Sequence, residues 1–310
     1  MRLARAQALG GLGEAFVAND MDEGVKLRHF DCIHFRQQFG SPRLIYPVAF
    51  PVKDAFNTEE HQTMTSKNGS RIAVVTGAGK KSGIGYEVCR QLAKAGMTVI
   101  LTGRDGAAVE ERTHELKAQG LDVLGRALDV TSASSVASLS AFLAESFGRV
   151  DVLVNNAPAT STYGEQPSTA DLERARESMD ATLFGGWRVA QALVSLLKKS
   201  EHGRVVNVSS GAGSHGDPAF GLTTKNSMGP AYAVAKAAVN ALTVTLANEL
   251  RSANVLVNAV CPGFTATFPG AESMGARPVA DGAASVVWAA VLADDGPSGG
   301  FFRDGKPLPW

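Results

Sequence analysis

The feature that most constrains the fold is a regular alternation of short apolar runs and helical segments that starts at Arg71. The apolar runs cover residues 72–76, 98–102, 121–128, 150–154, 204–209 and 255–260; the helical segments cover residues 84–95, 107–119, 134–147, 168–199, 229–250 and 279–292. Ser168, with Asp171 three residues later, predicts a capping-box start for the fourth helix. Apolar strands separated by helices are typical of a parallel sheet that is covered on both faces. We therefore expect an α/β fold with a single doubly wound, Rossmann-type sheet over residues 70–310.

Residues 1–69 do not share this alternation, and we interpret them as an N-terminal extension. They show no sustained helical period, and proline interrupts their second half. Met64 begins the stretch MTSKNGSRIAVVTGAG, which leads into the first predicted strand, and Glu59-Glu60 would be encoded by a purine-rich sequence where a bacterial ribosome-binding site would lie. We expect residues 1–63 to be a translated leader or a disordered extension.

The composition excludes several classes of function. The chain of 310 residues carries 30 basic and 30 acidic side chains, so no charge excess favours nucleic acid or an anionic membrane surface. No apolar run approaches the roughly 20 residues that span a bilayer. Cys32, Cys89 and Cys261 are far apart and odd in number, which favours a reducing, cytoplasmic compartment over a disulfide framework. His29, Cys32 and His34 lie close together but have no fourth ligand, so we expect no metal.

A glycine-rich loop, TGAGKKSGIG, joins the first strand to the first helix. Its glycines Gly77, Gly83 and Gly85 lie where backbone amides and a helix N-terminus can receive a pyrophosphate. The position directly after the first strand favours a phosphate-binding loop over a turn without a ligand.

The end of the second strand indicates which dinucleotide is bound. An NAD site would carry Asp or Glu about twenty residues after the glycine loop. This chain has Gly103 followed by Arg104 at that place, and the loop itself contains Lys80 and Lys81. These cations suit a 2′-phosphate, so the sequence predicts NADP(H) as the cofactor.

Tyr232 and Lys236 stand four residues apart in a segment almost free of helix breakers. This spacing places the phenol and the ammonium one turn apart on one face of a helix. A nearby cation stabilises the phenolate and lowers the tyrosine pKa from near 10 toward the working range of a general acid. Alone, the spacing is weak support for a catalytic pair.

Several elements in the same order resemble the short-chain dehydrogenase/reductase family, particularly its carbonyl-reductase-like members, over residues 70–310. The matching residues are Gly77, Gly83, Ile84 and Gly85 of the loop, Asp129-Val130, Asn155-Asn156-Ala157, Ser209-Ser210, Tyr232 and Lys236, and Pro262-Gly263 with Thr267. The resemblance implies that Asp129-Val130 approach the adenine. It also implies that Asn156 and Ala157 adjoin the cofactor and that the segment from Pro262 covers the nicotinamide.

The same resemblance implies the catalytic roles. Tyr232 would donate a proton to a carbonyl oxygen, Ser210 would orient that oxygen, and Lys236 would bind the nicotinamide ribose and keep the tyrosine pKa low. Two donors would thus meet the negative charge that develops on oxygen. The expected function is NADP(H)-dependent reduction of a ketone, an aldehyde or a quinone, with a small-molecule carbonyl or alcohol as the only expected partner. The sequence leaves the oligomeric state open.

The chain departs from the family pattern at Thr182, where the family carries an asparagine that holds a water for proton resupply. A threonine hydroxyl can bond the same water or a carbonyl of its own helix. The glycine loop and the Ser210–Tyr232 separation are also longer than usual. The extra residues after Gly213 are rich in Gly, Ser and Thr and predict a loop near the substrate mouth, with His215 exposed in it.

Thr182 also keeps a second class of function open, a dinucleotide-binding sensor or partner subunit with weak or lost catalysis. The intact Ser210, Tyr232 and Lys236 favour the enzyme. Arg104 disfavours an NAD-dependent alcohol dehydrogenase, and the absence of a sizeable substrate domain after Pro262 disfavours a sugar epimerase.

Overall fold

The computed structural model describes residues 69–157, 165–224 and 229–310. The expected leader and the group of His29, Cys32 and His34 lie outside the described residues. The first strand begins at Ile72, as the sequence predicts.

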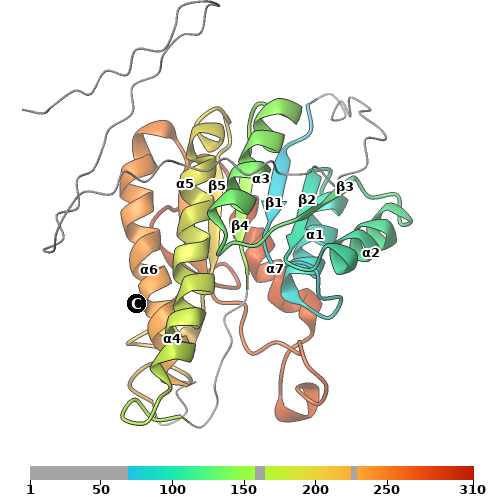
Figure 1. The fold of residues 1–310 in the computed structure, drawn as a ribbon. Helices are drawn as coiled ribbons and strands as arrows, with labels where there is room; N and C mark the ends of the chain where they lie inside the picture. The colour runs from blue at the N-terminus through green and yellow to red at the C-terminus, as the bar shows by residue number, and fades with distance from the viewer. Residues whose placement is uncertain (1–68, 158–164, 225–228) are drawn as a thin grey trace, which may run out of the picture. The chain divides into compact units, whose positions relative to one another are not determined.

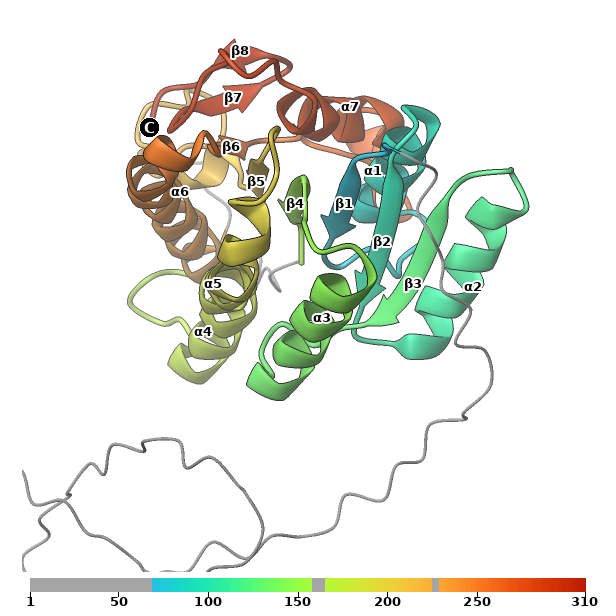
Figure 2. The same ribbon diagram turned by 90° about the horizontal axis from the view of Figure 1, so that it is seen from above.

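The described residues form one eight-stranded sheet in the order β3-β2-β1-β4-β5-β6-β7-β8. Figure 1 labels β1 to β5, and Figure 2 labels β1 to β8. The first seven strands are parallel, and β8 pairs antiparallel with β7. The strands are β1 Ile72–Val75, β2 Thr98–Gly103, β3 Val123–Ala127, β4 Val152–Asn155, β5 Arg204–Val208, β6 Leu256–Val260, β7 Phe301–Arg303 and β8 Lys306–Pro307. The predicted doubly wound parallel sheet is confirmed.

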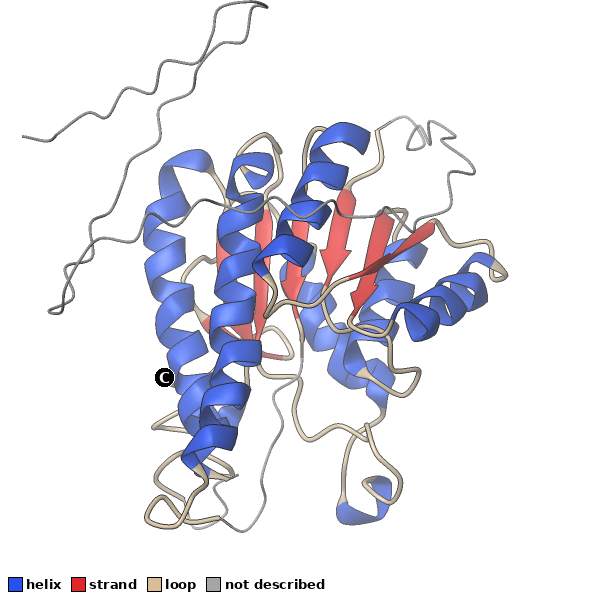
Figure 3. Cartoon of the chain, viewed as in Figure 1, coloured by secondary structure: helices blue, strands red, loops and turns tan. Residues whose placement is uncertain are grey.

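Helices cover both faces of this sheet (Figure 3). They are α1 Ile84–Lys94, α2 Gly106–Lys117, α3 Ala133–Ser146, α4 Leu172–Met179, α5 Gly185–Leu197, α6 Pro230–Leu250 and α7 Val279–Ala290. Viewed from above, α1 and α7 lie on one side of the sheet and α3, α5 and α6 on the other (Figure 2). Within the described ranges, no helix combines the length and apolar character that crossing a bilayer requires.

The strands are continuously apolar because both of their faces are buried. Ile72 and Val74 of β1 belong to a core with α3, α5 and α6, whereas Ala73 and Val75 belong to a second core with α1, α2 and α7. Successive strand residues point to opposite faces, so each strand contributes to both cores.

The strand order reverses next to β1, since β2 and β3 lie on one side of it and β4 and β5 on the other. In open α/β sheets, ligands bind beyond the carboxyl ends of the strands at such a switch point. The glycine loop after β1 and the asparagines at the end of β4 meet at this place.

The long fourth helix differs from its prediction in two respects. Asp171, and not Ser168, is the N-cap, because the Asp171 carboxylate accepts hydrogen bonds from the amides of Glu173 and Arg174. The helix is also interrupted by a π-helical segment, Asp180–Phe184, between α4 and α5. Such segments occur frequently at functional sites, and this one contains Thr182.

The hairpin formed by β7 and β8 is not among the elements predicted from the sequence. Asp304 and Gly305 connect the two strands with φ values of 54° and 72°, the left-handed conformations that a two-residue Asp-Gly hairpin turn favours. The strands are too short to show an alternating pattern, and β7 gains its order by pairing with β6. The hairpin brings the C-terminal residues back to the sheet.

Candidate active site

The glycine loop turns sharply at the end of β1 and is tied to the end of β4. Gly77 has a φ of 67°, a conformation that favours glycine. The Asn156 side chain donates to the carbonyl oxygens of Thr76 at 2.9 Å and Gly77 at 3.1 Å. A Cβ on Gly85 would lie 2.4 Å from Asn156 Nδ2, so this close contact requires glycine at position 85.

The amino end of α1 offers backbone amides to an anionic ligand. Its N-cap, Gly83, provides no side-chain acceptor, and the Gly83 amide donates to the carbonyl oxygen of Lys80 at 2.9 Å. The additional loop residues are therefore absorbed in a turn ahead of the helix. Uncapped amides at the positive end of a helix dipole suit a pyrophosphate. This edge of the sheet fits a dinucleotide, with Gly77, Ile84 and Gly85 among the residues that would hold it.

The cations expected near the 2′-phosphate have different surroundings. Lys80 Nζ donates to the carbonyl oxygen of Thr267 at 2.7 Å, and Lys81 pairs with Glu115 at 2.8 Å. Arg104 is exposed just after β2 and takes part in none of the ion pairs found among the described residues. Arg104 would therefore have no ion pair to leave on contacting a phosphate, whereas Lys81 would have to leave a surface pair, which is a weak interaction.

The segment after β3 is fixed by short-range hydrogen bonds. Asp129 Oδ1 accepts hydrogen bonds from the hydroxyl of Thr131 at 2.7 Å and from its amide at 2.9 Å, and these bonds lower the pKa of Asp129. The Val130 carbonyl oxygen accepts a hydrogen bond from Arg188 at 2.6 Å. On the β4 side, the Ala157 amide donates to the Thr76 hydroxyl at 3.0 Å.

Ser210 and Tyr232 open into one cavity of about 350 Å³. Ser210 follows β5, and its Oγ accepts a hydrogen bond from the Ala212 amide at 3.2 Å. Tyr232 lies in the first turn of α6. The rest of the lining includes the predicted cofactor residues Ile84, Pro262, Gly263 and Thr267, together with the aromatic rings of Phe220, Phe264 and Phe268.

Lys236 is buried one helical turn from Tyr232. Its Nζ donates to the carbonyl oxygen of Val208 at 2.7 Å and lies 5.7 Å from the centroid of the Tyr232 ring. None of the ion pairs among the described residues involves Lys236, and burial lowers its pKa from 10.5 to about 8. A cation with this pKa remains charged at neutral pH and favours the phenolate of the neighbouring tyrosine.

A second, smaller cavity lies behind Lys236 and is lined by Thr182, Asn155 and Asn207 among other residues. It offers about 10 Å³ to the centre of a water molecule, which is about the space that one water requires. Thr182 Oγ1 and Asn155 Oδ1 are buried and have no hydrogen-bond partner in the described part of the chain. The Thr182 hydroxyl therefore does not bond the carbonyl of its own helix.

The structure also places residues at the main cavity that sequence reasoning missed. Gly211, Cys261 and Arg303 line it together with the phenylalanines. Arg303 lies 71 residues beyond Tyr232 in the sequence numbering, in the unpredicted strand β7. The one sequence signal that could have indicated Arg303 as a cavity residue is its position as a basic residue at the end of a short apolar run, after Phe301 and Phe302. The described ranges contain no group of His, Cys, Asp and Glu side chains that could hold a metal.

Comparison with known proteins identifies the family. The family model described as short chain dehydrogenase matches residues 71–275. Salutaridine reductase of Papaver somniferum is 32% identical over 302 residues, covering 77% of this chain and 95% of that protein. Carbonyl reductase (NADPH) 3 of Rattus norvegicus is 33% identical over 280 residues, covering 78% of this chain and 99% of that protein.

A solved structure extends the likeness to three dimensions. A metagenomic short-chain oxidoreductase in complex with NADP has a TM-score of 0.61 and 28% identity, covering 74% of this chain and 93% of that chain. The match to the family model spans most of the described domain, and the two relatives align with this chain over almost their full length. The chain belongs to the short-chain dehydrogenase/reductase family of oxidoreductases.

Proposed function

We propose that this protein reduces a ketone, aldehyde or quinone carbonyl with NADPH and that Tyr232 is the proton donor. One observation carries the proposal: Ser210 and Tyr232 open into the same aromatic-lined cavity, while Lys236 is buried one turn from Tyr232. The names of the relatives, a salutaridine reductase and a carbonyl reductase, support a carbonyl substrate.

The proposed mechanism divides the work among these side chains. The dinucleotide, when bound, supplies the hydride. Ser210 and Tyr232 donate hydrogen bonds to the substrate oxygen and stabilise the negative charge that develops on it. Tyr232 then transfers its phenolic proton to that oxygen, and the Lys236 ammonium stabilises the phenolate that remains.

Proton resupply to Tyr232 is proposed to run through the small cavity behind Lys236. Thr182 Oγ1 and Asn155 Oδ1 are the buried polar atoms without partners at this cavity, and a water held between them would satisfy both. Lys236 lines the same space, so its ammonium would connect this water to the catalytic side.

Arg104 is proposed to select NADPH by contacting the 2′-phosphate. The NADP complex of the metagenomic oxidoreductase supports this cofactor. Lys80 and Lys81 would add positive charge nearby, and Asp129, Val130, Asn156 and Ala157 would adjoin the adenosine and nicotinamide ends as the family resemblance implies.

Replacement of Tyr232 tests the proposed chemistry. Tyr232→Phe keeps the ring and removes the donor, so we expect turnover to fall by on the order of 10²-fold or more while NADPH binding survives. Carbonyl reduction measured by NADPH absorbance, with binding measured by fluorescence titration, separates the two effects. Tyr86→Phe on α1, whose hydroxyl bonds Glu115, is the matched control. Unchanged turnover in Tyr232→Phe would point to another acid, or to a dinucleotide-binding protein whose apparent activity comes from a contaminating enzyme.

Replacement of Arg104 tests the cofactor preference. A charge-assisted contact to phosphate contributes roughly 1.5–3 kcal/mol, so we expect wild type to bind NADPH at least about tenfold more tightly than NADH. Arg104→Asp should reverse this order, and Lys81→Met, which breaks a surface pair with Glu115, should change it less. Equal affinities of wild type for the two cofactors in a titration would rule out the assignment.

Two substitutions of Thr182 test the proton path. Thr182→Asn keeps a water-binding group and should be nearly neutral, whereas Thr182→Val should slow turnover by about tenfold because the hydroxyl is lost at similar shape. Thr113→Val is the matched control, because the buried Thr113 hydroxyl only bonds the Val109 carbonyl of its own helix. Unchanged turnover in Thr182→Val together with raised turnover in Thr182→Asn would exclude proton resupply through Thr182.

Replacement of Lys236 should have opposite effects on the melting temperature and on NADPH binding. The folded pKa of about 8 lies below the ordinary 10.5, so the unfolded chain binds more protons between these values and stability rises with pH across that window. Lys236→Met removes the buried charge and should raise the melting temperature of the free protein at pH 7, with the gain shrinking between pH 8 and 10.5. NADPH binding should be lost. The exposed Lys94→Met is the control, and a lower melting temperature at pH 7 for Lys236→Met would contradict the unpaired burial of this lysine.

A further inference from the structure

The loop that follows Ser210 is closely packed by its glycines. A Cβ on Gly211 would lie 2.2 Å from Asp217 Oδ2, and a Cβ on Gly213 would lie 2.5 Å from the Ala237 amide nitrogen. A Cβ on Gly221 would lie 2.4 Å from the Asp217 carbonyl oxygen. These glycines permit close contacts within residues 211–221 and between this segment and α6.

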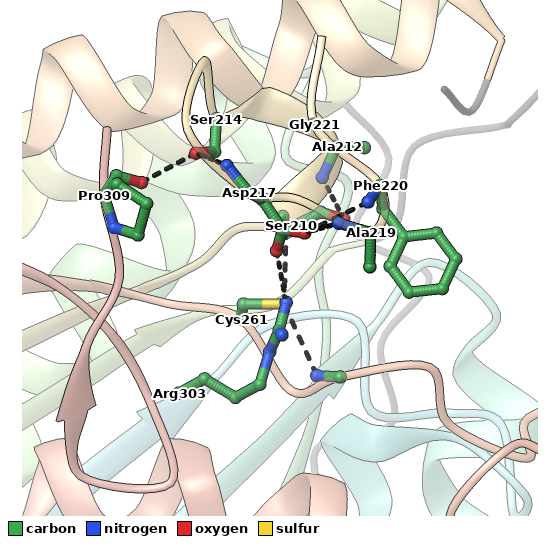
Figure 4. Close-up of polar contacts among 12 residues, drawn as sticks. Ser210, Ala212, Ser214, Asp217, Ala219, Phe220, Gly221, Cys261, Arg303 and Pro309 are labelled. Carbon is green, nitrogen blue, oxygen red and sulfur yellow. Dashed lines mark hydrogen bonds and ion pairs between the residues drawn. The ribbon is translucent and has the colours of Figure 1, made fainter. Parts of the chain in front are cut away.

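Asp217 is the centre of this loop (Figure 4). The residue is 1% exposed, and its Oδ1 accepts hydrogen bonds from the amides of Ala219 at 2.9 Å and Phe220 at 3.0 Å. Its Oδ2 accepts a hydrogen bond from Arg303 Nη2 at 2.9 Å. Burial alone would raise the pKa of Asp217, but these donors outweigh it and lower the pKa, so Asp217 is ionised at neutral pH. The carboxylate thereby fixes the backbone that carries Phe220 at the cavity.

The C-terminal residues hold the same loop from outside. The Trp310 carbonyl oxygen accepts hydrogen bonds from the amides of His215 at 2.9 Å and Gly216 at 3.2 Å. Ser214 donates to the Pro309 carbonyl oxygen at 2.7 Å (Figure 4). His215 itself is exposed, as the sequence predicts. The loop is therefore held by a segment that is distant in the sequence, since Ser214 and Pro309 are 95 residues apart.

Arg303 joins this loop to the rest of the cavity wall. Its Nη2 lies 3.1 Å from Cys261 Sγ, which also accepts a hydrogen bond from the Gly211 amide at 3.2 Å. Gly211, Phe220, Cys261 and Arg303 all line the cavity. Arg303 is the one charged residue in that lining, and Asp217 neutralises its charge. The wall is thus aromatic and carries no net charge.

We propose that Arg303, through Asp217, positions Phe220 and so selects bulky, uncharged, apolar ketones over small ones. The inference rests on the proposed carbonyl reductase function. Arg303 is a positioning residue, since its guanidinium acts on the substrate wall through the Asp217 carboxylate. The Pro309–Trp310 end supports the same wall from its outer side.

A matched pair of diketones tests the selectivity. Benzil and butane-2,3-dione share the reacting group and differ in having phenyl or methyl substituents. For Asp217→Asn and Arg303→Met we expect the KM for benzil to rise about tenfold, with kcat changed less than about threefold and the KM for butane-2,3-dione nearly unchanged. Arg303→Lys, which keeps the charge, should recover part of the benzil KM.

The control breaks another arginine–aspartate pair outside the cavity. Asp294 pairs with Arg204 Nη2 at 2.6 Å, and neither residue lines the cavity, so Asp294→Asn should leave both KM values unchanged. Equal KM changes for the two diketones in the Asp217 and Arg303 variants, or the same benzil KM rise in Asp294→Asn, would overturn the proposal.

Hydrogen exchange tests, without relying on turnover, whether Arg303 and the Pro309–Trp310 end hold the loop that carries Phe220. In Arg303→Met, and in a chain that ends at Leu308, the amides of His215, Gly216, Ala219 and Phe220 should exchange faster, while those of β4 and β5 keep their wild-type rates. Unchanged exchange in residues 214–221 of the folded variants would overturn the proposal. If wild type reduces neither diketone, the carbonyl reductase function fails for these substrates and the proposed selectivity fails with it. Faster exchange in the variants would then support only the holding of the loop by Arg303 and the Pro309–Trp310 end.

Discussion

The candidate site depends on one buried cation without a carboxylate partner. Lys236 donates to the carbonyl oxygen of Val208 at the end of β5, and this contact joins α6 to the central sheet. The loop after β5 packs on the same part of α6, where Ser209 bonds Asn240 at 2.5 Å. Burying an unpaired ammonium is costly, so stability does not explain the position, whereas the role proposed for Lys236 does. It fixes the helix that carries Tyr232 next to the loop that carries Ser210.

Much of the fold was predictable because its signals are local. Apolar strands between helices indicated the doubly wound sheet, and the glycine loop between β1 and α1 indicated the switch point. The closeness of Tyr232 and Lys236 was predictable for the same reason, since a separation of four residues on a helix fixes their geometry without knowledge of the rest of the chain. The family resemblance placed Ser210, which the sequence alone would assign to a turn.

The remaining features could not be predicted because they depend on distant contacts. The π-helical segment around Thr182 is bounded by Gly185, where a Cβ would lie 2.6 Å from Val130 Cγ2, a contact between α5 and the segment after β3. Arg303 meets Asp217 across 86 residues. The glycine-rich composition after Ser210 predicts a loop but does not reveal that its glycines permit close packing against Asp217 and α6. Nor does the sequence reveal that Glu115 on α2 engages Lys81.

The cavity has one side that local sequence patterns predict and another side that only contacts between distant segments form. The proposed reacting side is built from β5 and α6, where helical spacing places Tyr232 next to Lys236 and the contact of Lys236 with Val208 brings them to the loop that carries Ser210. The opposing wall is built from the loop containing Phe220, from Cys261 after β6 and from Arg303 on β7, and only tertiary contacts assemble it. Changes in that wall can alter the shape of the substrate space without moving Tyr232, the proposed proton donor. A family can therefore keep its chemistry while its substrates differ, and this is why the motifs of this chain indicate the reaction but do not name the substrate.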